Sequence, residues 1–144
     1  MSKNAQKKSV LFICTHNAAR SQMAEGFLRT LYGKYFDAYS AGTHPSVIHP
    51  YTIRVMGEVG IAISTYRAKS TDEFLGMQCD YVITVCDSAK EACPLFPHGK
   101  NYIHKSFEDP ARSEGTEEEK VALFRQVRDE IKEWIHKTFG SDNA

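Results

Sequence analysis

Residues 14–21, with the sequence CTHNAARS, combine side chains that can act together on an anion. Cys14 follows the apolar run VLFI, and Arg20 and Ser21 stand where a helical pattern begins. A tight loop between a strand and a helix turns backbone N–H groups inward, and the helix N-terminus adds partial positive charge. Such a loop can bind a tetrahedral oxyanion, to which the planar guanidinium of Arg20 can donate two hydrogen bonds. The residues predicted to bind the oxyanion are Thr15, His16, Asn17, Ala18, Ala19, Arg20 and Ser21.

The same loop predicts a nucleophile at Cys14. Cysteine attacks as the thiolate, and a helix N-terminus and a nearby cation both favour that charged form. The Ser21 hydroxyl could also donate a hydrogen bond to the sulfur. The alternative is a buried structural cysteine with Arg20 simply solvated, because cysteine is often a small core side chain. The combination of these residue types between a strand and a helix favours the catalytic interpretation.

A second pair of cysteines, Cys86 and Cys93, stands six residues apart in VITVCDSAKEACPLFP. Zinc sites prefer shorter spacings, and Cys79 would begin the strand that Cys86 ends, so a closed four-ligand site is hard to build. The alternative is thiol–disulfide exchange, in which a thiolate attacks a neighbouring sulfur and a third thiol resolves the disulfide. We favour the exchange and predict no metal site. Cys86 is expected beside Cys14, and Cys93 on an exposed, charged segment.

Two smaller predictions concern the loop, and a third concerns the remaining cysteine. Asn17 is expected to stabilise an unusual backbone conformation, because asparagine tolerates left-handed φ angles. The His16 side chain either contacts the anion or faces solvent, and we favour solvent. Cys79 is expected to pack at the start of its strand.

Short apolar runs alternate with segments of helical periodicity along the chain. The segments predicted to be strands are 9–14, 35–42, 79–86 and 101–106. The segments predicted to be helices are 21–31, 50–60, 70–76 and a last helix that starts at a Thr116–Glu119 capping box and ends before Gly140. This alternation predicts a doubly wound α/β fold with a parallel sheet. Ligands bind at the carboxyl ends of strands in such folds, where Cys14 and Cys86 fall.

Composition sets the broad class of the protein. A chain of 144 residues with a formal net charge of zero predicts one domain, residues 1–144, and gives no sign of a nucleic-acid or membrane surface. The polar start MSKNAQKKS has no apolar stretch of signal-peptide length behind it, so we expect a cytoplasmic protein. Thiols stay reduced there, and the four cysteines are therefore expected to be functional and not structural disulfides.

The loop CTHNAARS has the form C-x5-R-S, and the segments SQMAEGFLR, YSAG, GEVGIAIS and DPARSEGTEEEK extend the pattern. With these, nearly the whole chain resembles the low-molecular-weight protein tyrosine phosphatases and the thioredoxin-coupled arsenate reductases built on the same fold. The resemblance implies a four-stranded parallel sheet with helices on both faces. It also implies that Asp109, before Pro110, is the general acid; from the residues alone, a simple Asp–Pro loop turn is equally acceptable.

The pattern fits the reductase branch better. Phosphatases of this family usually carry an aromatic residue just after the Asp–Pro pair, where this chain has Ala111 and Arg112, whereas the reductases carry the C-x6-C pair. The resemblance therefore implies reduction of arsenate to arsenite for arsenic detoxification, with phosphate as a competing anion, no cofactor, and thioredoxin as reductant. The catalytic residues that it implies are Cys14, Cys86, Cys93, Arg20 and Asp109. A phosphotyrosine phosphatase, and a non-catalytic redox or zinc-binding module, remain the alternatives.

Overall fold

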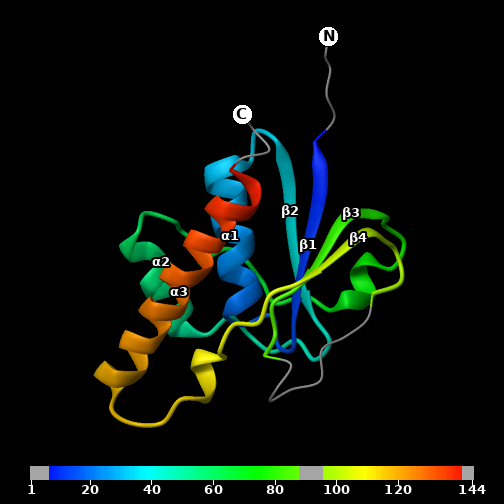
Figure 1. Cartoon of the computed structure of the whole chain (residues 1–144). Coiled ribbons are helices and arrows are strands. Elements are labelled where there is room, and N and C mark those ends of the chain that lie inside the picture. Colours follow the sequence, from blue (N-terminus) through cyan, green and yellow to red (C-terminus); the bar gives the residue numbers. More distant parts are fainter. Residues whose placement is uncertain (1–6, 88–95, 141–144) are drawn as a thin grey trace.

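The computed structural model describes residues 7–87 and 96–140, which form a parallel sheet with helices packed against it (Figure 1). The strands are β1 (Lys8–Cys14), β2 (Phe36–Gly42), β3 (Cys79–Thr84) and β4 (Gly99–His104). The α-helices are α1 (Arg20–Tyr32), α2 (Pro50–Glu58) and α3 (Glu117–Phe139), and two short 3-10 helices are η1 (Thr71–Phe74) and η2 (Pro110–Arg112). The predicted α/β class and the order of the elements are confirmed.

The strand order β2-β1-β3-β4 puts β1 between the two strands that it pairs with. In β1, Ile13 lies opposite Ala41 of β2 and Thr84 of β3, and all the pairings are parallel. The chain leaves β1 for a neighbour on one side and later returns to its other side. The carboxyl end of β1, where Cys14 lies, is therefore the switch point at which this type of fold binds ligands.

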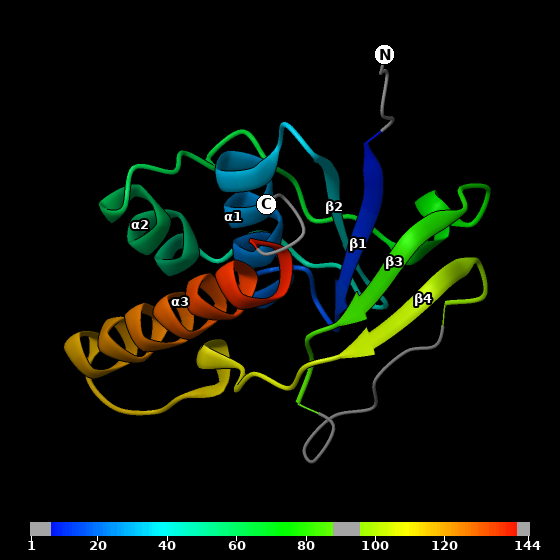
Figure 2. The same cartoon turned by 45° about the horizontal axis from the view of Figure 1, so that its top comes forward.

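The two faces of the sheet are covered differently (Figure 2). Alternate residues of β1, among them Phe12 and Cys14, pack into the large core under α1, α2 and α3. Leu11 and Ile13 face the other way, into a smaller cluster that includes Phe74 of η1. Helices thus cover both faces, as predicted, but in the described part of the chain the three α-helices share one face and η1 covers the other.

The last helix, α3, begins and ends as its sequence predicts. Thr116 and Glu119 form the capping box, with the Thr116 hydroxyl accepting from the Glu119 N–H and the Glu119 carboxylate accepting from the Thr116 N–H. Its predicted apolar stripe is buried: Val121, Phe124, Val127, Ile131 and Ile135. Within the ranges that the structure describes, no helix has the length and apolar character needed to cross a membrane.

Element ends differ from the prediction by a few residues. Helix α2 stops at Glu58, because Gly60 takes a φ of +82° and the chain reverses there. Strand β3 stops at Thr84, although the Val85 N–H still donates to the carbonyl of Ile13 at 2.9 Å. Strand β4 begins two residues earlier than predicted, at Gly99, because an exposed edge strand carries no apolar signal at its start.

Candidate active site

The backbone of the loop between β1 and α1, residues 15–19, is held from outside by the segment that follows β2. Three loop carbonyls accept hydrogen bonds from it: Thr15 O from His44 N at 2.8 Å, His16 O from Ser46 N at 3.1 Å and Ala18 O from His49 N at 3.1 Å. The peptide bonds of the described residues are all trans, so each N–H points opposite to the carbonyl of the same peptide. The N–H groups of His16, Asn17 and Ala19 therefore point to the inside of the loop.

The loop needs two special residues to take this shape. Asn17 has a φ of +53°, the left-handed conformation that was expected of it. Gly42, at the end of β2, lies directly behind the loop: a Cβ atom there would stand 2.5 Å from the Thr15 carbonyl oxygen and 2.8 Å from the Asn17 nitrogen. Only glycine leaves room for this contact.

The Asn17 side chain fixes the proton of Ser21. Its Oδ1 accepts from the Lys69 backbone N–H at 2.8 Å and from Gln22 Nε2 at 2.9 Å, and a backbone N–H can only donate. Asn17 Nδ2 therefore donates to Ser21 Oγ, at 2.7 Å. The Ser21 proton stays free to point at the Cys14 sulfur, which lies 2.9 Å from the hydroxyl oxygen.

Cys14 Sγ thus faces two donors, the Ser21 hydroxyl and the Asn17 N–H at 3.2 Å. The side chain is buried at the start of α1, where the N-cap residue Ala19 offers no side-chain hydrogen bond to the helix. No acidic residue stands in the first turn of the helix. Hydrogen-bond donors and the positive end of the helix dipole therefore both lie at this sulfur.

Arg20 and Asp109 meet over the loop although they are far apart in sequence. The Arg20 side chain is only 2 % exposed; its NH1 donates to the carbonyl of Phe107 at 3.3 Å, and its NH2 lies 3.5 Å from Asp109 Oδ2. Asp109 caps η2, with its Oδ1 accepting from the Ala111 N–H at 3.0 Å. The carboxylate is therefore held beside the Arg20 guanidinium by its contact with η2.

Cys86 is fully buried two residues beyond the end of β3. The preceding residue, Val85, still bonds to β1 one position before Cys14, so both cysteines lie at the carboxyl edge of neighbouring strands. Cys86 is disulfide-bonded, whereas Cys14 and Cys79 carry free thiols. Cys93 lies outside the described residues.

The sequence of the chain also matches a known protein family. The model of the low molecular weight phosphotyrosine protein phosphatases matches residues 9–141. The chain belongs to this family. The resemblance recognised in the sequence is thereby confirmed.

Several proteins similar to this chain are described as arsenate reductases. An arsenate reductase of Halalkalibacterium halodurans is 45% identical over 133 residues, covering 92% of this chain and 95% of the relative. A solved structure described as an arsenate reductase in the phosphate binding state has a TM-score of 0.79 at 32% identity, over 93% of this chain and 98% of the other. A thioredoxin-dependent arsenate reductase of Corynebacterium glutamicum has a TM-score of 0.65 at 30% identity, over 94% of this chain and 63% of the other.

The side chains of His16 and Cys79, for which the sequence predicted a position, both lie away from the Cys14 sulfur. The His16 side chain is exposed, and its Nδ1 donates to the carbonyl of His44 at 2.9 Å, because a carbonyl can only accept. Its ring thus lies on the outer side, as favoured from the sequence. Cys79 is buried at the start of β3, where burial raises the pKa of its thiol. Among the described residues, no three His, Cys, Asp or Glu side chains come together as metal ligands.

Four residues that support the loop between β1 and α1 from behind were not predicted from the sequence. These are Gln22, Gly42, Thr52 and Lys69. Gly42 gave a readable signal, because it closes a strand in the segment YSAG. Lys69 gave no signal in the sequence, because a lysine in a coil segment is normally solvated. In the structure, burial lowers the pKa of its ammonium group, and the carboxylate of Glu25, 3.7 Å away, opposes this shift.

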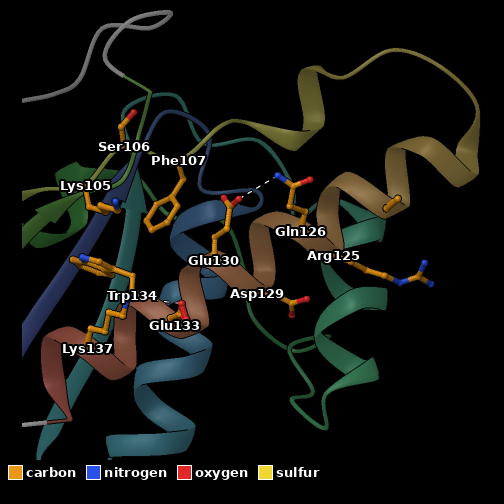
Figure 3. A pocket seen from close by; sticks show the side chains of 11 residues that line it. Lys105, Ser106, Phe107, Arg125, Gln126, Asp129, Glu130, Glu133, Trp134 and Lys137 are labelled. Atoms are coloured by element: carbon orange, nitrogen blue, oxygen red, sulfur yellow. Dashed lines mark hydrogen bonds and ion pairs between the residues drawn. The ribbon is translucent and has the colours of Figure 1, made fainter.

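A surface groove of about 850 Å³ lies beside the candidate active site, between α3 and residues 105–107 (Figure 3). The rings of Phe107 and Trp134 meet edge to face there, with their centroids 6.1 Å apart. None of the predicted site residues lines the groove. Phe107 links the groove to the site, because its carbonyl accepts a hydrogen bond from Arg20.

Proposed function

We propose that this phosphatase-family protein is an arsenate reductase. The observation that carries the proposal is the Cys14 sulfur, which faces two hydrogen-bond donors in a loop whose N–H groups point inward. Arg20 and Asp109 stand at the mouth of the same loop. The names of the relatives support arsenate as the oxyanion, and the phosphate-binding neighbour supports phosphate as its competitor.

The first step is a displacement on arsenic. The Cys14 thiolate attacks the bound arsenate and forms a sulfur–arsenic bond. One arsenic–oxygen bond breaks, and Asp109 gives its proton to the departing oxygen, which leaves as water. Arg20 and the loop N–H groups hold the remaining oxygens, where the negative charge collects.

The second step turns this displacement into a reduction. Cys86, as a thiolate, attacks the sulfur of Cys14, and the sulfur–arsenic bond breaks with its electron pair going to arsenic. Arsenic(V) becomes arsenic(III), arsenite leaves, and a Cys14–Cys86 disulfide remains. Phosphorus(V) does not accept the pair, so a phosphate adduct cannot follow this route.

The third step regenerates the nucleophile. Cys93 attacks Cys86, which moves the disulfide to Cys86–Cys93 and releases the Cys14 thiolate. Thioredoxin then reduces the final disulfide by the same exchange. The thioredoxin-dependent neighbour from Corynebacterium glutamicum supports this choice of reductant.

A second candidate function is hydrolysis of phosphotyrosine, favoured by the family match and by the shared loop. Water, and not a thiol, would then attack the Cys14 adduct. The residues after Asp109 argue against it, because the small Ala111 and the cationic Arg112 replace an aromatic wall for the substrate ring. This candidate requires that Cys86→Ser keeps full turnover.

The decisive assay follows NADPH oxidation in the presence of thioredoxin, its reductase and arsenate. We expect NADPH consumption that depends on arsenate, is slowed by phosphate, and disappears in Cys14→Ser. Cys79→Ser is the matched control, since it removes a cysteine outside the relay and should keep turnover. If NADPH consumption does not depend on arsenate and the protein hydrolyses a tyrosine phosphate fully, the protein is a phosphatase and the proposed reductase function is wrong.

A further inference from the structure

The Ala18 carbonyl of the anion loop accepts two hydrogen bonds from the start of α2. The His49 N–H lies 3.1 Å from this oxygen, and Thr52 Oγ1 lies 2.9 Å from it. Thr52 is fully buried, so its hydroxyl is a permanent part of the wall behind the loop. Neither residue belongs to the chemical steps described above.

Two donors on one carbonyl fix the plane of the peptide that joins Ala18 to Ala19. The N–H of Ala19 lies in that plane and points the opposite way, into the loop. A carbonyl that accepts two hydrogen bonds is also more polarised, and this strengthens the N–H of the same peptide as a donor. The start of α2 therefore sets both the direction and the strength of one donor to the anion.

The His49 side chain holds this start of α2 in place. Its Nδ1 accepts from the Tyr51 N–H at 3.0 Å, which makes His49 the N-cap before Pro50 at the first helical position. The ring packs against Tyr51 and against Phe124 of α3, with centroids 4.9 and 4.8 Å apart. Burial lowers the pKa of His49, assisted by Lys120 and opposed by Asp109, so the neutral ring that can accept at Nδ1 is favoured.

We propose that His49 and Thr52 are positioning residues for the anion loop, acting through the Ala18 carbonyl on the N–H of Ala19. They touch neither the anion nor the reacting sulfur. The proposal rests on the oxyanion-binding role of the loop, and it adds α2 to the elements that shape this site.

The test is a calorimetric titration of folded variants with inorganic phosphate at fixed neutral pH. Thr52→Val removes the hydroxyl at nearly constant volume, and His49→Ala removes the cap. Each should weaken phosphate binding about fivefold, as expected for the loss of one neutral hydrogen bond. The conservative variants Thr52→Ser and His49→Asn keep the donor and the cap, and they should bind within about twofold of the wild type.

Thr116→Ala is the matched control, because it removes the N-cap of α3 without a contact to the loop. It should lower the stability of the protein and leave phosphate affinity unchanged. If Thr52→Val and His49→Ala bind phosphate like the wild type, or lose no more affinity than Thr116→Ala, the positioning role is wrong. If the wild type itself binds no phosphate, the proposed function of the loop fails instead.

Discussion

The hydroxyl oxygen of Ser21 lies 2.9 Å from the sulfur of Cys14 and accepts a hydrogen bond from the Asn17 side-chain amide at 2.7 Å. The serine follows Arg20 in the first turn of α1, so the same turn carries the proposed anion ligand and the hydroxyl beside the proposed nucleophile. A hydrogen bond to a charged acceptor is about twice as strong as a neutral one. The proposed mechanism uses Cys14 as the thiolate, and this contact offers that form a charge-assisted hydrogen bond.

Ser21→Ala should slow the alkylation of Cys14 by iodoacetamide about tenfold at neutral pH, because the thiolate loses a charge-assisted hydrogen bond. Mass spectrometry of labelled peptides over time gives the rate for each cysteine. In the wild type, Cys14 should react before Cys79, and phosphate or arsenate should protect it. Equal rates at both cysteines, unaffected by either anion, would show that the loop does not activate Cys14.

Arg20→Lys keeps the positive charge but loses the planar pair of donors. We expect phosphate or arsenate to bind at least about tenfold more weakly, since a charge-assisted hydrogen bond is lost. The control is Arg54→Lys, which changes an exposed ion pair with Glu117. Oxyanion affinity that is the same in both variants and the wild type would contradict a role for Arg20 in the loop.

Asp109→Asn should slow the first formation of arsenite by about 100-fold, because a general acid contributes at least that much. Phosphate affinity should not fall, since the amide removes a negative charge from beside Arg20. Glu108→Gln changes the adjacent exposed carboxylate and should leave the rate unchanged. The rate for both variants is measured by counting arsenite after rapid quenching. An unaltered rate in Asp109→Asn would mean that the carboxylate only caps η2 and does not act as the general acid.

Glu58 links α2 to α3 and should make stability depend on pH. Hydrogen bonds from Arg125, and secondly from Arg128, lower its pKa from 4.5 to about 2. A lowered pKa in the folded state means that this stabilisation is complete above the unfolded value and is lost as the pH falls from about 4.5 towards 2. Denaturant unfolding should show Glu58→Gln less stable than the wild type at pH ~7, with a difference that shrinks below pH ~4.

The exposed Glu114 offers the control for this measurement, because Glu114→Gln changes a carboxylate outside that network. Its stability difference from the wild type should be small at every pH. A Glu58→Gln difference that stays constant down to acid pH would mean that the arginines do not hold this carboxylate.

Much of the fold could be predicted from the sequence, because capping residues and apolar periodicity indicate the same helices and strands. The Thr116–Glu119 box and the apolar stripe after it fix the start and the buried face of α3 from neighbouring residues alone. The strand–loop–helix unit around Cys14 was readable for the same reason, since an apolar strand and an amphipathic helix flank the loop.

The support behind the loop was not readable, because it depends on tertiary contacts. Asn17 meets the backbone of Lys69 across more than fifty residues of sequence, and Ala18 meets Thr52. The position of Asp109 over Arg20 came only from the family resemblance. Sequence periodicity describes the faces of single elements and does not show which element packs behind a loop.

The central claim is the order in which three thiols act, and a single-turnover experiment without external thiol tests it most directly. Arsenate is mixed with reduced enzyme, arsenite is counted, and disulfides are mapped by mass spectrometry. Cys86→Ser should release no arsenite, because the arsenic adduct on Cys14 has no attacking thiol. Cys93→Ser should release about one arsenite per enzyme and stop as a Cys14–Cys86 disulfide. Release by Cys86→Ser but not by Cys93→Ser would reverse the two roles, and full multiple turnover of both variants with thioredoxin would contradict the relay.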